Sequence, residues 1–308
     1  MGMGKHLIEA VVREHLYKPI AGDVLLIGRQ TVYLSPDELV RTIREHGVSL
    51  QVDPSSIEVD QTTLDRRRGY GERLVNDAAF FKLLGARSVK ALDHSPYEGA
   101  DVIHDLRYPV PNDLHGIADF IVDGSTLDNV FTPSIVLQNY AKLLRPGGRL
   151  LMENAFSPHN TAYVMMPPMW YLDYFVMNKF VDCKVYIVMF LEDKIRAMVD
   201  NVFWVDIDQV SVMRRRMQRF VSPHQMVTIV FAERGENSTV DRLPNQQDYR
   251  SPEEWSEYLA NLDVIRQSKR HHLVRSRTER VVERPILGHP FIDGEYCVQV
   301  SVSPEPAP

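Results

Sequence analysis

The sequence contains little cysteine, no long apolar run and no excess of positive charge. Its 308 residues include two cysteines, Cys183 and Cys297, which are far apart and form no CxxC pair. This spacing excludes a disulfide framework and a cysteine-rich zinc site, and it is typical of proteins in a reducing cytosol. We therefore expect a cytoplasmic protein that carries no metal.

The apolar residues are not arranged for a membrane. No stretch of about 18 successive apolar residues occurs, so no membrane-spanning helix is predicted. Residues 1–16 alternate charged and apolar side chains, which is not the pattern of a secretory signal peptide. Lysine and arginine total 35 against 41 aspartates and glutamates, a net charge of −6. A mildly acidic chain lacks the overall positive field that drives general nucleic-acid binding.

Short apolar runs alternate with amphipathic segments along most of the chain. We predict helices at 5–17, 36–46, 76–84, 133–144, from 168 onward and at 251–268, and strands at 23–28, 88–93, 100–105, 119–124, 149–153, 184–190 and 227–232. Strands that alternate with helices predict a parallel sheet with helices on both faces. The fold class is therefore α/β.

Two regions do not follow this alternation. Residues 50–75 are polar, contain Arg66-Arg67-Arg68 and predict an insertion within a domain that spans 1–235. Beyond Arg234 the pattern weakens, and we assign 236–308 to a C-terminal extension. It would contain the helix at 251–268 and a disordered, proline-rich tail, SVSPEPAP.

The most informative stretch runs from 119 to 153. A buried strand ends in Asp123-Gly124, and a polar loop and an amphipathic helix then lead to Pro146-Gly147-Gly148 and another buried strand. Residues 144–151 (LRPGGRLL) and 103–106 (IHDL) resemble motifs of the class I S-adenosylmethionine-dependent methyltransferases. The resemblance covers about 20–235 and is strongest over 88–153. It implies a Rossmann-like, mostly parallel sheet with an antiparallel C-terminal strand pair, and S-adenosylmethionine as cofactor.

The resemblance also implies a cofactor site. In an open parallel sheet, ligands bind beyond the carboxyl ends of the strands, near the place where strand order reverses. The expected cofactor contacts follow predicted strands and are Gly28, Arg29, Asp93, His94, Asp105, Leu106, Asp123 and Gly124. Asp93 would accept both ribose hydroxyls, and Asp105 with the backbone of Leu106 would meet the adenine edge. For Asp105 and Asp123, capping of a strand-end turn is an equally good interpretation.

The loop after the first strand departs from the family pattern. The family has a glycine-rich GxGxG loop, whereas this chain has Ile27-Gly28-Arg29-Gln30-Thr31 with one glycine. Arg29 and Gln30 then occupy space that glycines leave open, although Arg29 would compensate by pairing with the cofactor carboxylate. The alternative is a non-catalytic, methyltransferase-like protein that binds a partner. A nicotinamide-dependent oxidoreductase is disfavoured, because the first strand is not followed by GxGxxG.

The segment after the strand at 149–153 is expected to meet the substrate. Glu153 and Asn160 are candidate contacts, and His159 is a candidate general base because imidazole titrates near neutrality, although exposed loop histidines are more common. Met166 and Trp170 belong to a methionine-aromatic cluster that would line an apolar pocket, although a core or a homodimer interface is more typical. We therefore expect methyl transfer to a small-molecule acceptor, without a nucleic-acid or membrane partner.

Overall fold

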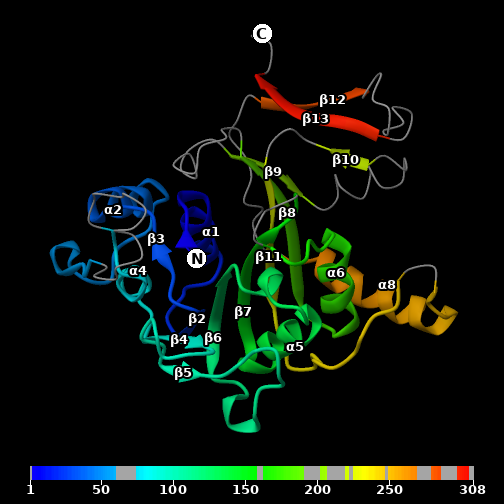
Figure 1. The fold of residues 1–308 in the computed structure, drawn as a ribbon, viewed down its shortest axis with the longest axis horizontal. Coiled ribbons are helices and arrows are strands. Elements are labelled where there is room, and N and C mark those ends of the chain that lie inside the picture. The colour runs from blue at the N-terminus through cyan, green and yellow to red at the C-terminus, as the bar shows by residue number, and fades with distance from the viewer. Residues whose placement is uncertain are drawn as a thin grey trace.

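One large sheet organises the chain. The computed structural model describes residues 2–59, 74–157, 162–190, 202–206, 219–221, 225–246, 249–268, 279–285 and 297–304. Eight strands in these ranges pair in the order β5-β4-β2-β6-β7-β11-β8-β9 (Figure 1). They are β2 (Asp23–Ile27), β4 (Ser88–Asp93), β5 (Val102–Ile103), β6 (Ala118–Gly124), β7 (Leu144–Ala155), β8 (Asp182–Phe190), β9 (Val202–Asp206) and β11 (Met226–Glu233).

The strand directions agree with the predicted fold class. β5, β4, β2, β6 and β7 are all parallel to their neighbours in this part of the sheet. β11 lies antiparallel between β7 and β8, so β8 runs in the same direction as β7. β9 pairs antiparallel with β8 at the edge. The mostly parallel sheet with antiparallel pairing near its C-terminal end is thereby confirmed.

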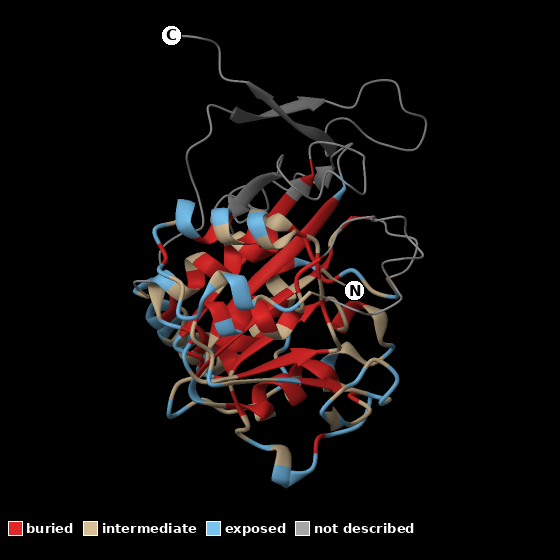
Figure 2. Cartoon of the chain, turned by 90° about the vertical axis from the view of Figure 1, so that its left-hand side faces the viewer, coloured by how far each residue is buried: buried red, intermediate tan, exposed pale blue. Residues whose placement is uncertain are grey.

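Helices cover both faces of the sheet. One face packs against α1 (Lys5–Tyr17), α2 (Pro36–Glu45) and α4 (Asp77–Leu83), and the other against α5 (Pro133–Leu143), α6 (Pro168–Met177) and α8 (Pro252–Arg266). Successive side chains of a strand point to opposite faces. Along β2, Val24 and Leu26 therefore join the first core, whereas Leu25 and Ile27 join the second. Figure 2 shows the central strands buried between these two layers.

Local sequence signals set the starts of two helices. At α2, the Ser35 hydroxyl accepts a hydrogen bond from the Glu38 N–H, and the Glu38 carboxylate accepts one from the Ser35 N–H. The same reciprocal capping box joins Ser251 and Glu254 at the start of α8. These bonds satisfy backbone N–H groups that have no partner within the helix. Both helices accordingly begin where the sequence predicts.

The N-terminus is bound to the loop that follows β2. β1 (Gly2–Met3) pairs in parallel with β3 (Thr31–Val32), a two-residue pairing that the sequence does not predict. Further along the predicted insertion, Pro54–Ser56 form the short 3-10 helix η1, and Val75 bridges both Val32 and Val59. Residues 60–73 of this insertion lie outside the described residues.

The C-terminal extension is joined to the preceding residues. β13 (Cys297–Pro304) pairs with β12 (Glu279–Pro285) and with β10 (Arg219–Val221), which precedes the predicted boundary at 235. Residues 301–304, predicted to belong to a disordered tail, instead lie in a strand, and 305–308 are outside the described residues.

α8 packs on the main sheet and its helices. The Tyr258 hydroxyl donates to Asp173 of α6 at 2.8 Å, and Lys184 Nζ of β8 donates to the Ile265 carbonyl at 2.9 Å. The extension thus contributes to the second core. None of the helices in the described ranges combines the length and apolarity that a bilayer crossing requires.

Candidate functional site

The carboxyl ends of β2 and β4 meet where strand order reverses. The chain runs from β2 outward through β4 to β5 and then crosses back to β6 on the other side of β2, so the strand order reverses beside β2. Gly28 follows β2 directly with φ +70°, and its N–H donates to the Leu92 carbonyl at 2.7 Å. A Cβ at Gly28 would stand 3.5 Å from Asp93 Oδ2. The missing Cβ therefore leaves space over the Asp93 carboxylate, at the kind of edge where ligands bind.

Asp93 is positioned by its two successors. Its Oδ1 accepts a hydrogen bond from the Ser95 N–H at 3.2 Å and lies 2.7 Å from Nδ1 of the exposed His94. The Asp93 side chain is 21% exposed. Because Oδ1 is engaged, Oδ2 is the atom that faces the space beside Gly28. Gly28, Asp93 and His94 are therefore brought together as the sequence predicts.

Asp105 follows β5 and is held by a neighbouring cation. Arg107 Nε and Nη2 donate to Asp105 Oδ2 at 3.0 and 2.6 Å, and these bonds lower the pKa of Asp105 to about 2. The Leu106 carbonyl accepts a hydrogen bond from the buried Asn139 Nδ2 at 2.9 Å. The Asp105 carbonyl is also engaged, by the Tyr108 N–H at 3.0 Å, so the N–H side of the Asp105–Leu106 backbone is what would meet a base edge.

Arg29 binds protein groups rather than facing the space over Asp93. Its Nη2 donates to the Gly99 carbonyl at 3.0 Å, and its guanidinium lies 3.3 Å from the carboxylates of both Asp77 and Asp101. Two carboxylates compensate the charge, so pairing with a cofactor carboxylate would require these contacts to break. In this structure Arg29 instead ties the loop after β2 to α4 and to the loop before β5.

Asp123 is fully buried beneath the carboxyl edge. Its carboxylate accepts hydrogen bonds from the Thr126 N–H at 2.5 Å, the Leu127 N–H at 3.1 Å and the Tyr140 hydroxyl at 3.0 Å. Burial raises the pKa of Asp123 to about 7. Asp123 therefore caps the turn after β6, which is the second of the two interpretations given for this residue from the sequence. It presents no atom to a ligand in this structure.

Gly124 is covered by two side chains. A Cβ at this position would lie 3.1 Å from Leu7 Cδ2 and 3.3 Å from Gln30 Oε1. Gln30 is only 2% exposed, and its Nε2 donates to the Ile27 carbonyl at 2.8 Å. The sequence shows Gln30 only as a bulky residue in a glycine position, because no local pattern indicates the direction of its amide. The covered Gly124 differs from the open cofactor contact that the sequence predicts.

Glu153, a predicted substrate contact, pairs with a histidine that sequence reasoning misses. Glu153 lies opposite Gly124 in the register of β6 and β7. Its Oε2 is 2.6 Å from Nε2 of His6, whose side chain is 1% exposed against 16% for Glu153. The rings of His6 and Phe190 pack nearly perpendicular to each other, with centroids 5.0 Å apart. A buried imidazole beside a partly exposed carboxylate can hold or pass a proton.

The other predicted substrate residues are less informative. Met166 is buried in the core beneath α5 and α6, which agrees with the core interpretation of the methionine cluster. Trp170 packs edge-on against Tyr171 with ring centroids 5.1 Å apart. His159 and Asn160 fall in 158–161, outside the described residues.

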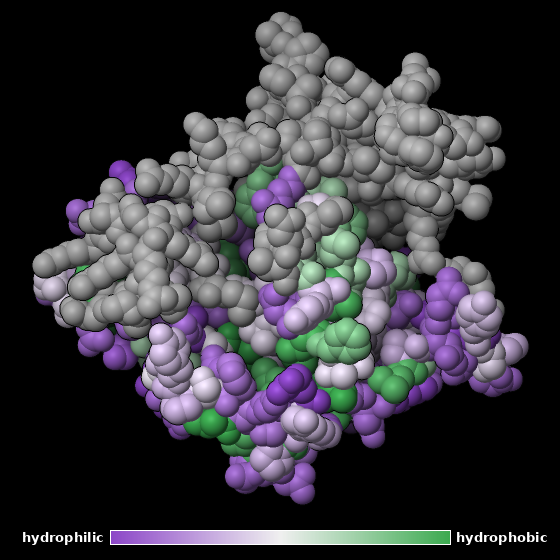
Figure 3. Space-filling model, in the orientation of Figure 1, coloured by the Kyte–Doolittle hydropathy of each residue, from purple (hydrophilic) through white to green (hydrophobic). Residues whose placement is uncertain are grey.

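Two exposed aromatic rings were not singled out from the sequence. Phe131 precedes α5, Tyr163 follows β7, and their ring centroids lie 6.4 Å apart although both side chains are exposed. The Tyr163 N–H donates to the Asp128 carbonyl at 2.8 Å, which joins the two loops. Figure 3 shows hydrophobic residues gathered in the middle of the face that it presents. The available signal was an aromatic residue in each of the segments that lead from β6 to α5 and from β7 to α6.

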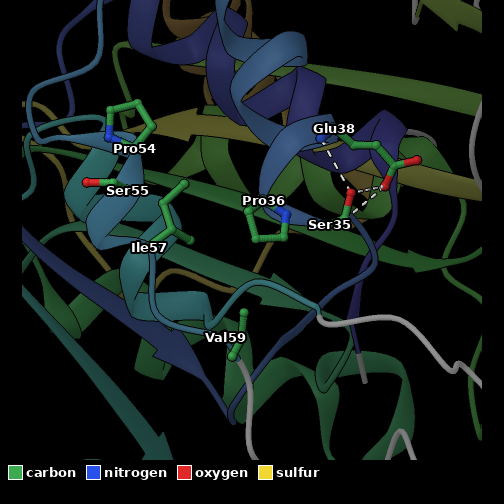
Figure 4. Close-up of a pocket in the computed structure, with 7 residues that line it drawn as sticks. All are labelled: Ser35, Pro36, Glu38, Pro54, Ser55, Ile57 and Val59. Atoms are coloured by element: carbon green, nitrogen blue, oxygen red, sulfur yellow. Dashed lines mark hydrogen bonds between the residues drawn. The ribbon is translucent and has the colours of Figure 1, made fainter.

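A cavity of about 610 Å³ lies away from Gly28 and Asp93, between the start of α2 and the segment at 54–59 (Figure 4). Its lining includes Ser35 and Glu38, whose polar groups bind each other in the capping box, and the prolines Pro36 and Pro54. Because these polar groups are already engaged, the cavity offers little chemistry to a ligand.

The edge near Gly28 fits S-adenosylmethionine in its donor and acceptor groups. At the end expected to meet the adenosine, Asp93 supplies a partly exposed carboxylate acceptor beside Gly28. At the amino-acid end, Gln30 Oε1 is a buried acceptor without a hydrogen-bond partner in the part of the chain that the structure describes. A ribose offers hydroxyl donors and an ammonium group offers N–H donors, so both ends of the cofactor find an acceptor.

Comparisons with known proteins give structural likeness at low identity. No family model and no curated protein sequence matches the chain. A 1,6-didemethyltoxoflavin-N1-methyltransferase from Burkholderia thailandensis, solved with S-adenosylhomocysteine, is 13% identical, with a TM-score of 0.30 over 74% of this chain and 77% of that one. The trans-methyltransferase CalH in complex with SAH is 12% identical, with a TM-score of 0.33 over 73% and 55%.

A third similar structure is the CurJ carbon methyltransferase. It is 12% identical, with a TM-score of 0.34 over 75% of this chain and 54% of that one. The chain therefore spans about half the length of the second and third of these proteins. All three are methyltransferases, and the likeness concerns the fold alone.

Proposed function

We propose that this protein is an S-adenosylmethionine-dependent methyltransferase that acts on a small molecule. The observation that carries the proposal is the placement of Gly28 beside the partly exposed Asp93 carboxylate at the strand-order reversal, where glycine puts no Cβ against the carboxylate oxygen. The resemblance of residues 103–106 and 144–151 to the class I family supports it.

The residues at this edge have separate tasks in binding. Asp93 Oδ2 accepts hydrogen bonds from the ribose hydroxyls, and the exposed His94 packs beside the adenosine. The backbone at Asp105 and Leu106, held by Arg107 and Asn139, contacts the base. The bound cofactor would supply an electrophilic methyl group on a sulfonium, so the chain mainly has to align the acceptor in line and exclude water.

The His6–Glu153 pair provides a place for the proton of the acceptor. The bound cofactor would supply the methyl group and keep the electron pair of the broken carbon–sulfur bond, and an O–H or N–H acceptor would give up its proton. The proton released by an O–H or N–H acceptor passes to the Glu153 carboxylate. His6 Nε2, 2.6 Å from Glu153 Oε2, fixes the orientation of that carboxylate. The exposed rings of Phe131 and Tyr163 supply an apolar surface for the acceptor near the ends of β6 and β7.

Calorimetric titration with S-adenosylhomocysteine tests the proposal. The wild-type chain should bind it, and Asp93→Asn should weaken binding about 100-fold, because hydrogen bonds to a charged carboxylate contribute about 1.5–3 kcal/mol each. Asp113→Asn is the matched control, since Asp113 is exposed in the 3-10 helix η2 (Asn112–Leu114). Equal affinity in all three proteins would contradict the assigned role of Asp93.

One observation favours the alternative of a non-catalytic, partner-binding protein. Leu7 and Gln30 cover Gly124, and Asp123 lies beneath the surface with all of its contacts made by protein groups. The same titration discriminates between the two functions. Absence of both binding heat and a thermal shift with either S-adenosylmethionine or S-adenosylhomocysteine would favour the partner-binding protein.

A further inference from the structure

We infer that Gln30 is the receptor for the α-ammonium group of the cofactor, in place of the missing glycine-rich loop. The inference rests on the proposed function and names a contact at the amino-acid end of the same site. It concerns the loop between β2 and β3, where the chain carries one glycine at Gly28.

The backbone and amide nitrogen of Gln30 are fixed by protein groups. The Gln30 N–H donates to Asp77 Oδ2 at 2.9 Å, and Nε2 donates to the carbonyls of Ile27 at 2.8 Å and Gly28 at 3.4 Å. Carbonyl oxygens only accept hydrogen bonds, so the atom facing them must be the NH₂ group. The identity of Oε1 on the opposite side of the amide follows from this chemistry.

Gln30 Oε1 is a buried acceptor that the protein leaves unused. It has no hydrogen-bond partner among the residues that the structure describes, and Gln30 is 2% exposed. An acceptor left without a donor in the interior is costly, so native proteins rarely keep one without a reason. The oxygen lies 3.3 Å from the point where a Cβ of Gly124 would stand, between the ends of β2 and β6.

The chemistry of this oxygen selects its ligand. An amide oxygen binds only a hydrogen-bond donor, and the donor at the amino-acid end of the cofactor is the ammonium group. The carboxylate at that end, which only accepts, has no complement in Gln30 Oε1. The nearby cation Arg29 is compensated by Asp77 and Asp101, so it does not oppose a second positive charge. Leu7 Cδ2 shares the space over Gly124, and binding requires this side chain to turn aside.

The test compares ligands with and without the amino group. Titration calorimetry is run with S-adenosylhomocysteine, with its deaminated analogue, which keeps the carboxylate, and with 5′-methylthioadenosine, which lacks the amino-acid end. The proteins are wild type, Gln30→Met, Gln30→Lys and the control Gln51→Met, since Gln51 is exposed and its amide donates to the nearby Ser49 carbonyl. Gln30→Lys keeps a donor for the Ile27 and Gly28 carbonyls, so it preserves the loop if Gln30→Met fails to fold.

The expected result is a loss confined to the ammonium group. Wild type and Gln51→Met should bind S-adenosylhomocysteine about 10- to 100-fold more tightly than its deaminated analogue, the range for one charge-assisted hydrogen bond. In both Gln30 variants this ratio should fall to about 1, while the affinity for 5′-methylthioadenosine stays within about 2-fold.

Two results would overturn the inference, and a third would overturn its foundation. If the Gln30 variants keep the wild-type ratio, another group receives the ammonium. If the affinity of the variants for 5′-methylthioadenosine falls as much as their affinity for S-adenosylhomocysteine, Gln30 only supports the loop. If the wild-type chain binds none of the three ligands, the proposed function itself fails.

Discussion

Asp123→Asn should remove a large pH dependence of stability between pH 4 and pH 7. Burial raises the pKa of Asp123 to about 7 from an ordinary value of 3.8. The nearby carboxylate of Asp128 raises it further, whereas the hydrogen bonds from Leu127, Tyr140 and Thr126 lower it. Asparagine has a similar shape and carries no charge, so the substitution removes the titration while keeping an acceptor oxygen.

The direction of this pH dependence follows from which state of the chain, folded or unfolded, holds the proton. Between pH 4 and pH 7 the folded chain keeps a proton on Asp123 that the unfolded chain releases. The free energy of unfolding therefore falls as the pH rises through this window and levels off above it. A pKa difference of about three units corresponds to about 4 kcal/mol. The ion pair that lowers the pKa of Asp105 to about 2 acts at lower pH, where its stabilisation is lost as the pH falls below 4.

Urea unfolding of wild type and Asp123→Asn at pH 4 to 8 measures this effect. The difference between the two free energies of unfolding should change by about 4 kcal/mol across the window, in favour of the variant at high pH. The pKa of His15 is lowered by burial and by Arg149, but His15 is common to both proteins, so its contribution cancels in the difference. Parallel curves would refute the reasoning, because they would mean that Asp123 titrates alike in the folded and unfolded chains.

Three further substitutions test how the framework holds the site. Glu14→Gln removes the carboxylate that lies 2.7 Å from the buried Arg149 guanidinium, and it should lower the free energy of unfolding in urea by about 3–5 kcal/mol. A loss below about 1 kcal/mol would mean that the guanidinium is not desolvated. Asn139→Leu leaves the Val110 N–H and the Leu106 carbonyl without their hydrogen-bond partner and should lower the free energy of unfolding by about 2–5 kcal/mol in the same assay. It should also weaken S-adenosylhomocysteine binding, and unchanged binding would mean that Leu106 does not contact the base. Ser35→Ala removes the α2 cap and should lower the free energy of unfolding by about 1 kcal/mol in thermal unfolding, without changing ligand affinity. A changed affinity would mean that the start of α2 contributes to the binding site.

The elements that local signals control were predictable. Buried apolar runs such as 119–124 and the serine-proline starts of α2 and α8 fix strands and helices through interactions within a few residues. The parallel order then brings Gly28 and Asp93 together, because the carboxyl ends of neighbouring parallel strands share one edge. These parts of the fold, and the position of Gly28 beside Asp93, followed from the sequence.

The parts that depend on distant contacts were not predictable. His6 and Glu153 are 147 positions apart, and the direction of the Gln30 amide depends on the carbonyls that surround it. Asp123 carries the same strand-end signal as Asp93, yet donors from Thr126 and Tyr140 turn it into an internal cap. Sequence position shows that a carboxylate ends a strand, and packing decides whether it faces a ligand.

The most direct test of the central claim is to locate the binding site in solution. Backbone amide shifts of the ¹⁵N-labelled wild-type chain are recorded while S-adenosylhomocysteine is added. The account predicts the largest changes at Gly28, at Asp93 and His94, and at Leu106, with the cavity at 54–59 unaffected. Saturating changes elsewhere, or no change at millimolar ligand, would contradict it.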